Sequence, residues 1–184
     1  MMYFAGRQLC ALLSRFGDDR QGISAVEFAL VLPLMLTLYL GATEVSLGVA
    51  TDRKITLTAR TVADLASQMQ KINNVDMNNL LNASAAVMQP YPTAPLKITV
   101  SSVKIDKDGK ATIEWSDTRN GTARSPGSAA SLPAALTIPG TWLIWGEVQY
   151  TYTPAVGYVV SGPLNLKDQI FMRPRISQSV TREP

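Results

Sequence analysis

The sequence has no histidine and only one cysteine, Cys10, among its 184 residues. Without an imidazole, the chain cannot form a Ser-His or Cys-His nucleophile pair or an HExxH zinc motif. A single cysteine cannot form a disulfide within the chain. The GxxxxGK[ST] phosphate loop is missing as well. We therefore expect a protein that is not an enzyme and that has no cofactor and no metal site.

Charge is also sparse, at 17% of the residues, with a net charge of +3. The basic residues form no cluster of the kind that follows a nucleic-acid backbone, so we expect no nucleic-acid partner. Six acidic residues of the C-terminal domain stand on expected turns or between polar neighbours, which indicates a solvated surface rather than a glycosidase pair. They are Asp106, Asp108, Glu114, Asp117, Glu147 and Asp168. The acidic run at Asp106–Gly109 lacks the other ligands of an EF-hand loop and favours a simple turn.

One long apolar stretch stands out, because Phe28–Thr43 carries no formal charge. As a helix it spans about 24 Å, less than the ~30 Å hydrocarbon core, so we predict a transmembrane segment over residues 23–50, with Glu27 and Glu44 near its ends. A buried core helix of a soluble protein is the alternative. It is disfavoured because the stretch is apolar on every face. Pro33 removes one backbone hydrogen bond, so we expect a kink there.

The segment before the apolar stretch carries a small excess of positive charge. Its charged residues are Arg7, Arg15 and Arg20 against Asp18 and Asp19. This bias predicts a cytoplasmic amino terminus and a periplasmic C-terminal domain. A secretory signal peptide would carry its cleavage site after the apolar region, whereas the only processing-like feature here, Gly22, precedes it.

Gly22 is followed by four residues, then by Glu27 and Phe28, then by the apolar stretch. This order resembles the processing site of type IV prepilins, in which a prepilin peptidase cuts after the glycine. The resemblance implies that residues 1–22 are a cytoplasmic leader that is removed, and that Ile23 is the first residue of the mature chain. It also implies that Glu27 and Phe28 belong to a processing and assembly motif.

A narrower resemblance covers about residues 16–70. The run RQGISAVEFALVLPLML, with the later Glu44 and the pair Ala59-Arg60, is similar to the TadE-like pseudopilins of the tight-adherence (Tad, Flp-type) pilus. This resemblance implies a minor pilin-like subunit that takes part in assembling an adhesion pilus, with roles in cell adhesion and biofilm formation. The implied partners are a prepilin peptidase, other pilin-like subunits, the assembly platform and the bacterial inner membrane. The alternative is an uncleaved bitopic inner-membrane protein whose periplasmic domain binds another protein.

Beyond the apolar stretch the helical pattern becomes amphipathic. Its apolar residues recur at spacings of three and four, or sums of these: Val45, Val49, Ile55, Ala59, Val62, Ala66 and Met69. We predict one helix from about Asp19 to about Lys71, whose amphipathic outer half is residues 51–72. The apolar stripe of that half has two possible partners, the chain's own C-terminal domain or the helices of neighbouring subunits. Arg60 and Asp64 are expected to form an i,i+4 ion pair.

Residues 73–184 are predicted to form a small α+β domain with an antiparallel sheet. A short helix over Asp76–Met88 is ended by Pro90, Pro92 and Pro95. Apolar and polar residues then alternate over Leu96–Ile105, and the phase slips at Ser101-Ser102, which indicates a β-bulge. A turn at Asp106–Gly109 leads into a second alternating stretch over Ala111–Trp115, which completes a hairpin.

The rest of this domain is predicted to contain two more strands. Residues 117–141 are poor in large apolar side chains and are expected to form a surface loop that is a candidate contact region. The next strand is expected to place Trp142, Ile144, Val148, Tyr150 and Tyr152 on one face and Trp145, Glu147 and Gln149 on the other. Leu164–Met172 is expected to give a last strand, and Arg173–Pro184 a frayed tail. The overall expectation is an α+β chain with a long N-terminal transmembrane, pilin-like helix and a small antiparallel-sheet domain.

Overall fold

The computed structural model describes residues 20–154, 157 and 162–184 of the chain, with side chains from residue 22 onward. The leader predicted over residues 1–22 lies almost entirely outside the described residues. The chain divides into two compact units, which meet between Thr43 and Glu44.

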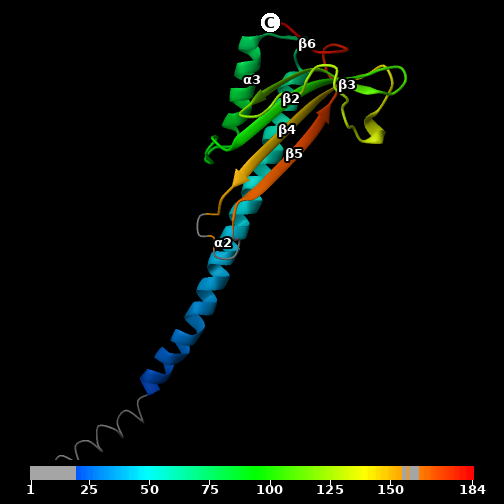
Figure 1. Cartoon of the computed structure of the whole chain (residues 1–184). Helices are drawn as coiled ribbons and strands as arrows, with labels where there is room; N and C mark the ends of the chain where they lie inside the picture. The colour runs from blue at the N-terminus through cyan, green and yellow to red at the C-terminus, as the bar shows by residue number, and fades with distance from the viewer. Residues whose placement is uncertain (1–19, 155–156, 158–161) are drawn as a thin grey trace, which may run out of the picture. The chain divides into compact units, whose positions relative to one another are not determined.

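Helix α2 (Arg20–Ser67) is the first described element, and its 48 residues confirm the predicted long helix (Figure 1). It ends four residues before the predicted Lys71, because Lys71–Ile72 forms strand β1. Pro33 lies inside the helix and does not end it. The Thr37 hydroxyl donates a hydrogen bond to the Pro33 carbonyl oxygen (2.8 Å). The kink expected at Pro33 stays a prediction.

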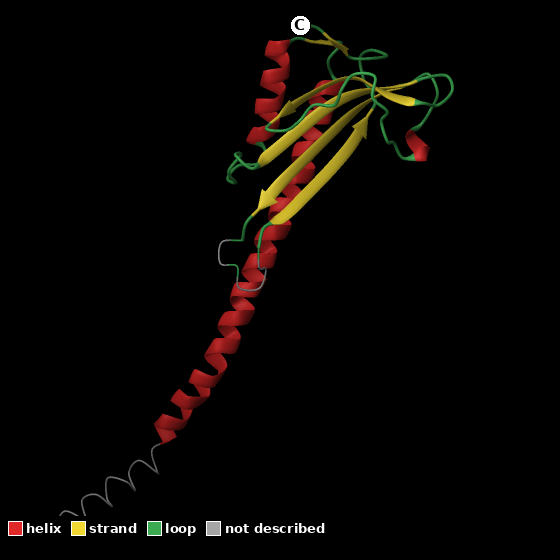
Figure 2. Cartoon of the chain, in the orientation of Figure 1, coloured by secondary structure: helices red, strands yellow, loops and turns green. Residues whose placement is uncertain are grey.

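The second unit is built on a four-stranded antiparallel sheet with the order β3-β2-β4-β5 (Figure 2). Its strands are β2 (Leu96–Ile105), β3 (Ala111–Arg119), β4 (Trp142–Tyr152) and β5 (Leu164–Met172). All four predicted strands are confirmed. The register between β2 and β3 shifts between Ser102 and Val103, one residue beyond the predicted phase slip. Strand β3 runs to Arg119, so the prediction that a loop begins at residue 117 was wrong.

Helix α3 (Asn74–Ala86) confirms the predicted second helix, but it begins two residues earlier. Asn73 is the reason, because its side-chain oxygen accepts a hydrogen bond from the Asp76 backbone N–H (2.8 Å). This is the N-cap interaction that short polar side chains make at the start of a helix.

The main core lies where the outer half of α2 and helix α3 pack against one face of the sheet. Buried residues of α2 recur at the predicted spacing and join those of α3: Ile55, Ala59, Val62, Ala63, Ala66, Met77, Leu80, Leu81 and Ala85. Sheet residues Ile98, Val100, Ile144 and Val148 complete this cluster and are fully buried. The apolar stripe of α2 is therefore used inside the chain's own domain, which was one of the two predicted partners.

Gly146 is the point where α2 comes closest to the sheet. A Cβ atom at this position would lie 2.9 Å from the Ala59 carbonyl oxygen and 2.9 Å from a methyl carbon of Val62. The backbone of β4 can approach the helix this closely only because residue 146 has no side chain.

The opposite face of the sheet has a smaller core. Its buried residues are Val103, Ile105, Ala111, Ile113, Leu143 and Trp145. Part of the segment between β3 and β4 covers them, since Ala130, Leu132 and Leu136 pack against this cluster and residues 134–136 form the 3-10 helix η1 (Ala134–Leu136). The expectation of a loop lying wholly at the surface was therefore wrong, because this segment closes a second layer.

The C-terminal residues form part of the fold, so the prediction of a frayed tail was wrong. Strand β6 (Thr181–Arg182) pairs in parallel with β1 (Lys71–Ile72). Val180 is fully buried, and its carbonyl oxygen accepts a hydrogen bond from the Trp115 indole N–H (2.6 Å). No pattern in the sequence predicts this pairing, because each strand is only two residues long.

Ion pairs attach the same tail to the rest of the unit. Arg182 pairs with Asp117 (2.9 Å) and also donates to the Ile72 carbonyl oxygen (3.2 Å). Asp64, predicted to pair with Arg60, instead pairs with Arg175 (2.5 Å). The tertiary partner replaces the local one because the tail folds back over the end of α2.

We predict that Gly146→Ala destabilises the second unit by about 1–3 kcal/mol, the usual range for an added methyl group in a packed core. The new Cβ meets a backbone carbonyl of α2, which cannot move as freely as a side chain. Urea unfolding of the full chain in detergent micelles, followed by tryptophan fluorescence, measures this change. Gly48→Ala is the matched control, because its Cβ would lie 4.0 Å from the nearest atom, a ring carbon of Tyr152. Equal stability of the two variants would contradict the close contact at Gly146.

We predict that Arg182→Gln destabilises the second unit by about 1–2 kcal/mol, because it leaves the half-buried Asp117 without its ion pair. Lys71→Gln is the control, since it removes the exposed ion pair between Lys71 and Glu183 (2.6 Å), and such pairs contribute little to stability. The same urea titration compares the two variants. If both unfold at the midpoint of the unmodified chain, the tail does not stabilise the fold.

Candidate functional site

The candidate processing segment lies in the first described turns of α2. Gly22, Ile23, Glu27 and Phe28 are all exposed, and a Cβ at Gly22 would have no other atom within 4 Å. The peptide bond between Gly22 and Ile23 lies inside the helix. A peptidase that needs an extended backbone must therefore unwind this first turn. Glycine lowers the cost of that unwinding, because it is less stable in a helix than alanine by about 0.5–1 kcal/mol.

Ile23 and Glu27 are four residues apart in α2 and therefore lie on the same side of the helix. A free amino group on Ile23 would lie within one helical turn of the Glu27 carboxylate. The helix thus places the two ends of the predicted motif, the cleavage position and the glutamate, next to one another.

The apolar segment that follows is exposed on all sides in the first unit. Its large side chains are between 37% and 75% exposed: Ile23, Val26, Phe28, Leu30, Val31, Leu32, Leu34, Met35, Leu36, Leu38 and Tyr39. The helix has the length and composition needed to cross a membrane. A core helix of a soluble protein would bury such a set of side chains. The exposure therefore disfavours that alternative and is what a lipid-facing helix or a subunit-packing helix requires.

At Glu44 the surroundings of α2 change from exposed to partly buried. It is 4% exposed, and Thr51 and Ile55 beyond it are fully buried within the second unit. Residues 22–43 remain as the exposed part, and as a helix they measure about 33 Å, which matches the ~30 Å hydrocarbon core. Within the predicted span over residues 23–50, some side chains from Glu44 onward therefore pack on the chain's own domain.

A tyrosine cluster lies close to Glu44 in the second unit. Burial raises the pKa of Tyr150, and the neighbouring Tyr91 and Tyr152 raise it further. Burial also raises the pKa of Tyr152, with smaller effects from Tyr91 and Glu44. Tyr150 and Tyr152 are therefore neutral at physiological pH, and they give the predicted aromatic face of β4 a packing role.

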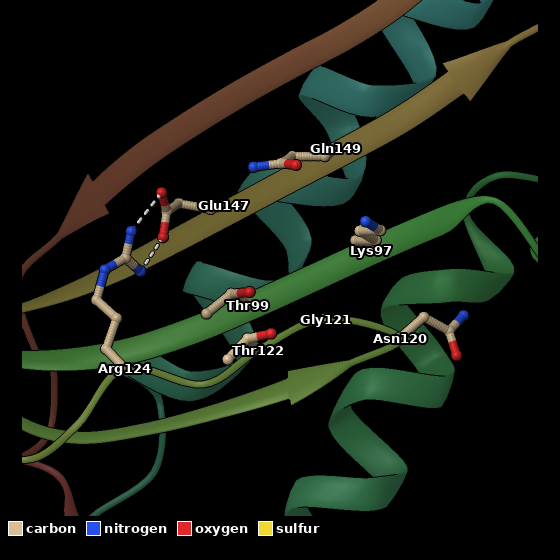
Figure 3. Close-up of a pocket in the computed structure, with 8 residues that line it drawn as sticks. All are labelled: Lys97, Thr99, Asn120, Gly121, Thr122, Arg124, Glu147 and Gln149. Atoms are coloured by element: carbon tan, nitrogen blue, oxygen red, sulfur yellow. Dashed lines mark hydrogen bonds and ion pairs between the residues drawn. The ribbon is translucent and has the colours of Figure 1, made fainter.

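A polar groove of about 450 Å³ lies on the face of the sheet that α2 does not cover (Figure 3). Its lining residues come from β2, β4 and the segment after β3: Lys97, Thr99, Asn120, Gly121, Thr122, Arg124, Glu147 and Gln149. Two side-chain amides and two hydroxyl groups can hydrogen-bond to a polar molecule here. The lining also includes one amine, that of Lys97, and one carboxylate, that of Glu147.

Arg124 closes one end of the groove. Both of its terminal nitrogens donate to the Glu147 carboxylate, and its guanidinium stacks on the Trp145 ring, 3.8 Å from the centroid. Glu147 and Asp117 were both interpreted as solvated carboxylates, and this was wrong, because each is held by an arginine. Sequence reasoning missed Arg124 and Arg182 since each lies far along the chain from its partner.

Metal ligands are sparse in this protein. Across residues 20–154, 157 and 162–184, no group of three or more Asp, Glu, His or Cys side chains is placed to hold an ion. At the Asp106–Gly109 turn, Asp106 accepts from the Asp108 and Lys110 backbone N–H groups (3.0 and 2.7 Å). These contacts support the interpretation of this run as a turn.

Comparison with known proteins gives one match. The model of the TadE-like protein family matches residues 22–64, from the candidate cleavage glycine to the buried part of α2. This confirms the resemblance seen in the sequence over that segment. No match was found among curated proteins or among solved structures.

Proposed function

We propose that this chain is a minor pilin-like subunit that takes part in assembling a Tad-type adhesion pilus. In this proposal it enters the inner membrane with its N terminus in the cytoplasm and is cut by a prepilin peptidase after Gly22. The second unit then lies outside the membrane and acts by contact with other subunits, without catalysis. Prepilin peptidase, other pilin-like subunits and the assembly platform are the proposed partners.

One observation carries the proposal. The TadE-like match begins at Gly22, and residues 22–43 form a mostly exposed, largely apolar helix that ends where Glu44 is buried in a folded domain. An exposed apolar helix of this length requires either lipid or neighbouring helices around it. The helix of a pilin-like subunit is surrounded first by lipid, in the membrane, and later by neighbouring helices, in the assembly.

Glu27 has a specific role in this proposal. A carboxylate near the end of a membrane span is costly, at up to about 2.5–3.5 kcal/mol for a position at the centre of the span. The amine released at Ile23 offsets part of this cost, either within the same chain or in a neighbouring subunit. Pairing with a neighbour would fix the axial register between two subunits.

The rival function is an uncleaved bitopic inner-membrane protein whose outer domain binds another protein. It would use the same exposed helix as a simple anchor and would leave Gly22 and Glu27 without a role. The two proposals differ in the mass of the chain in its host, because only the first removes the leader.

We predict that Gly22→Val blocks processing in the native host, because a branched side chain next to the scissile bond hinders the close approach of the peptidase. Mass spectrometry of the purified membrane protein should show that the chain without the substitution begins at Ile23, whereas the Gly22→Val variant keeps the leader. Gly48→Val is the matched control, since it introduces the same side chain at a glycine outside the motif. If the unmodified chain and Gly22→Val both keep the leader, the rival function is correct.

We predict that Glu27→Gln is still cut but no longer associates with partner pilins. Glutamine keeps the shape of the side chain and removes the charge that pairs with the Ile23 amine. Affinity pull-down from detergent extracts should lose the partner pilins by about tenfold, the change that corresponds to ~1.4 kcal/mol of lost pairing. Glu27→Asp, which keeps the charge, should restore part of the association. Full association of Glu27→Gln would show that the charge has no part in assembly.

A further inference from the structure

The two edges of the sheet are not equivalent. The outer edge of β3 is occupied by its own chain, since Ile113 donates to the Ser128 carbonyl oxygen (2.9 Å) and Ala130 donates to that of Ala111 (3.0 Å). Further along β3, Trp115 and Asp117 bind the C-terminal tail. The Ala111–Ile113 part of this edge is therefore closed, so another strand cannot pair along its whole length.

Strand β5 forms the other edge and is open. All nine of its residues pair with β4 without a register shift. Within the described part of the chain, no backbone hydrogen bond from any other segment reaches β5, and the Asp168 carboxylate accepts one from the neighbouring Gln169 backbone N–H (2.8 Å). A long and regular strand with one unpaired side is a template for an added strand. Figure 2 shows β5 as the outermost long strand of the sheet.

The side chains of β5 show what such a strand would meet. The residues that face the helix side alternate along the strand: Leu164, Leu166, Asp168, Ile170 and Met172. Leu166, Ile170 and Met172 are only partly buried against the main core, and Leu164 is 38% exposed. The helices thus leave an apolar row half covered, with one carboxylate, that of Asp168, at its centre.

We propose that the β5 edge binds an extended segment of another protein by β-strand addition. The segment has apolar residues at alternate positions, which extend the half-covered row, and a lysine or arginine opposite Asp168. Cross-strand pairs of opposite charge stabilise strand pairing, and like charges directly opposite each other destabilise it. This interaction does not depend on cleavage after Gly22.

A second copy of this chain fits the edge poorly. The antiparallel pairing that uses all nine residues of both strands places Asp168 directly opposite Asp168 of the other copy. Pairing of β5 with the whole length of β3 of another copy is prevented by the segment that closes part of β3. The charge pattern therefore favours a partner of different sequence.

The alternative is that Lys167 and Asp168 only protect the edge, because charged side chains on an edge strand discourage unwanted pairing. Under that alternative the strand binds nothing, and removing the charges causes aggregation. The two possibilities differ in whether a charge-matched strand binds.

The test uses the full chain in detergent micelles and a fluorescent, end-capped peptide, Val-Thr-Val-Thr-Lys-Thr-Val-Thr-Val. Binding is measured by fluorescence anisotropy against a second peptide with glutamate at the centre. We expect the lysine peptide to bind roughly fivefold more tightly, the effect of exchanging an attractive for a repulsive cross-strand pair. Asp168→Lys should reverse this preference, and Asp168→Asn should abolish it, so that the charge effect is measured on two variants.

Two N-methylated forms of the lysine peptide test the strand pairing itself. One carries methyl groups on the odd-numbered amides and the other on the even-numbered amides, so each form blocks one edge of the peptide. Strand addition requires that one form binds and the other does not. Absence of binding up to about 1 mM peptide, which corresponds to a free energy near −4 kcal/mol, overturns the proposal. Equal binding of the two methylated forms, or a preference unchanged in Asp168→Lys, overturns it as well.

Discussion

The close packing of α2 on the centre of the sheet is the contact on which the second unit depends. It requires a residue without a side chain at position 146, because Ala59 and Val62 occupy the space that a Cβ atom would need. The same packing buries one side of α2 from Glu44 onward, whereas most of the large apolar side chains before Glu44 are exposed. A single helix therefore belongs to a folded domain over one part of its length and is free for lipid or other subunits over the other.

The proposed function follows from this division. The exposed part matches the thickness of a bilayer, and it carries at its start the glycine and the glutamate that the proposal assigns to processing and register. The second unit contributes surfaces, and its arginine–carboxylate pairs hold the loop and the tail in place. An open strand edge then gives this unit a means of contact that needs no pocket.

Much of this organisation could be predicted from the sequence alone. The apolar run, the motif from Gly22 to Phe28 and the alternation along β2, β4 and β5 are local patterns, and each reports the structure of its own segment. The tail and the segment after β3 could not be predicted, because their partners lie far away in the chain. Arg182 binds Asp117 and Arg124 binds Glu147, pairings that no local periodicity records.

The sequence by itself thus determined the long helix, its membrane-length apolar part, the candidate cleavage motif and the four strands, since all of these depend on neighbouring residues. Only the tertiary structure decided where α2 stops being exposed, which edge of the sheet stays open and how the C-terminal tail is held. Those features depend on which distant segments come together in the folded chain. Burial at Glu44, partial closure of the β3 edge and the β1–β6 pairing are all of this kind.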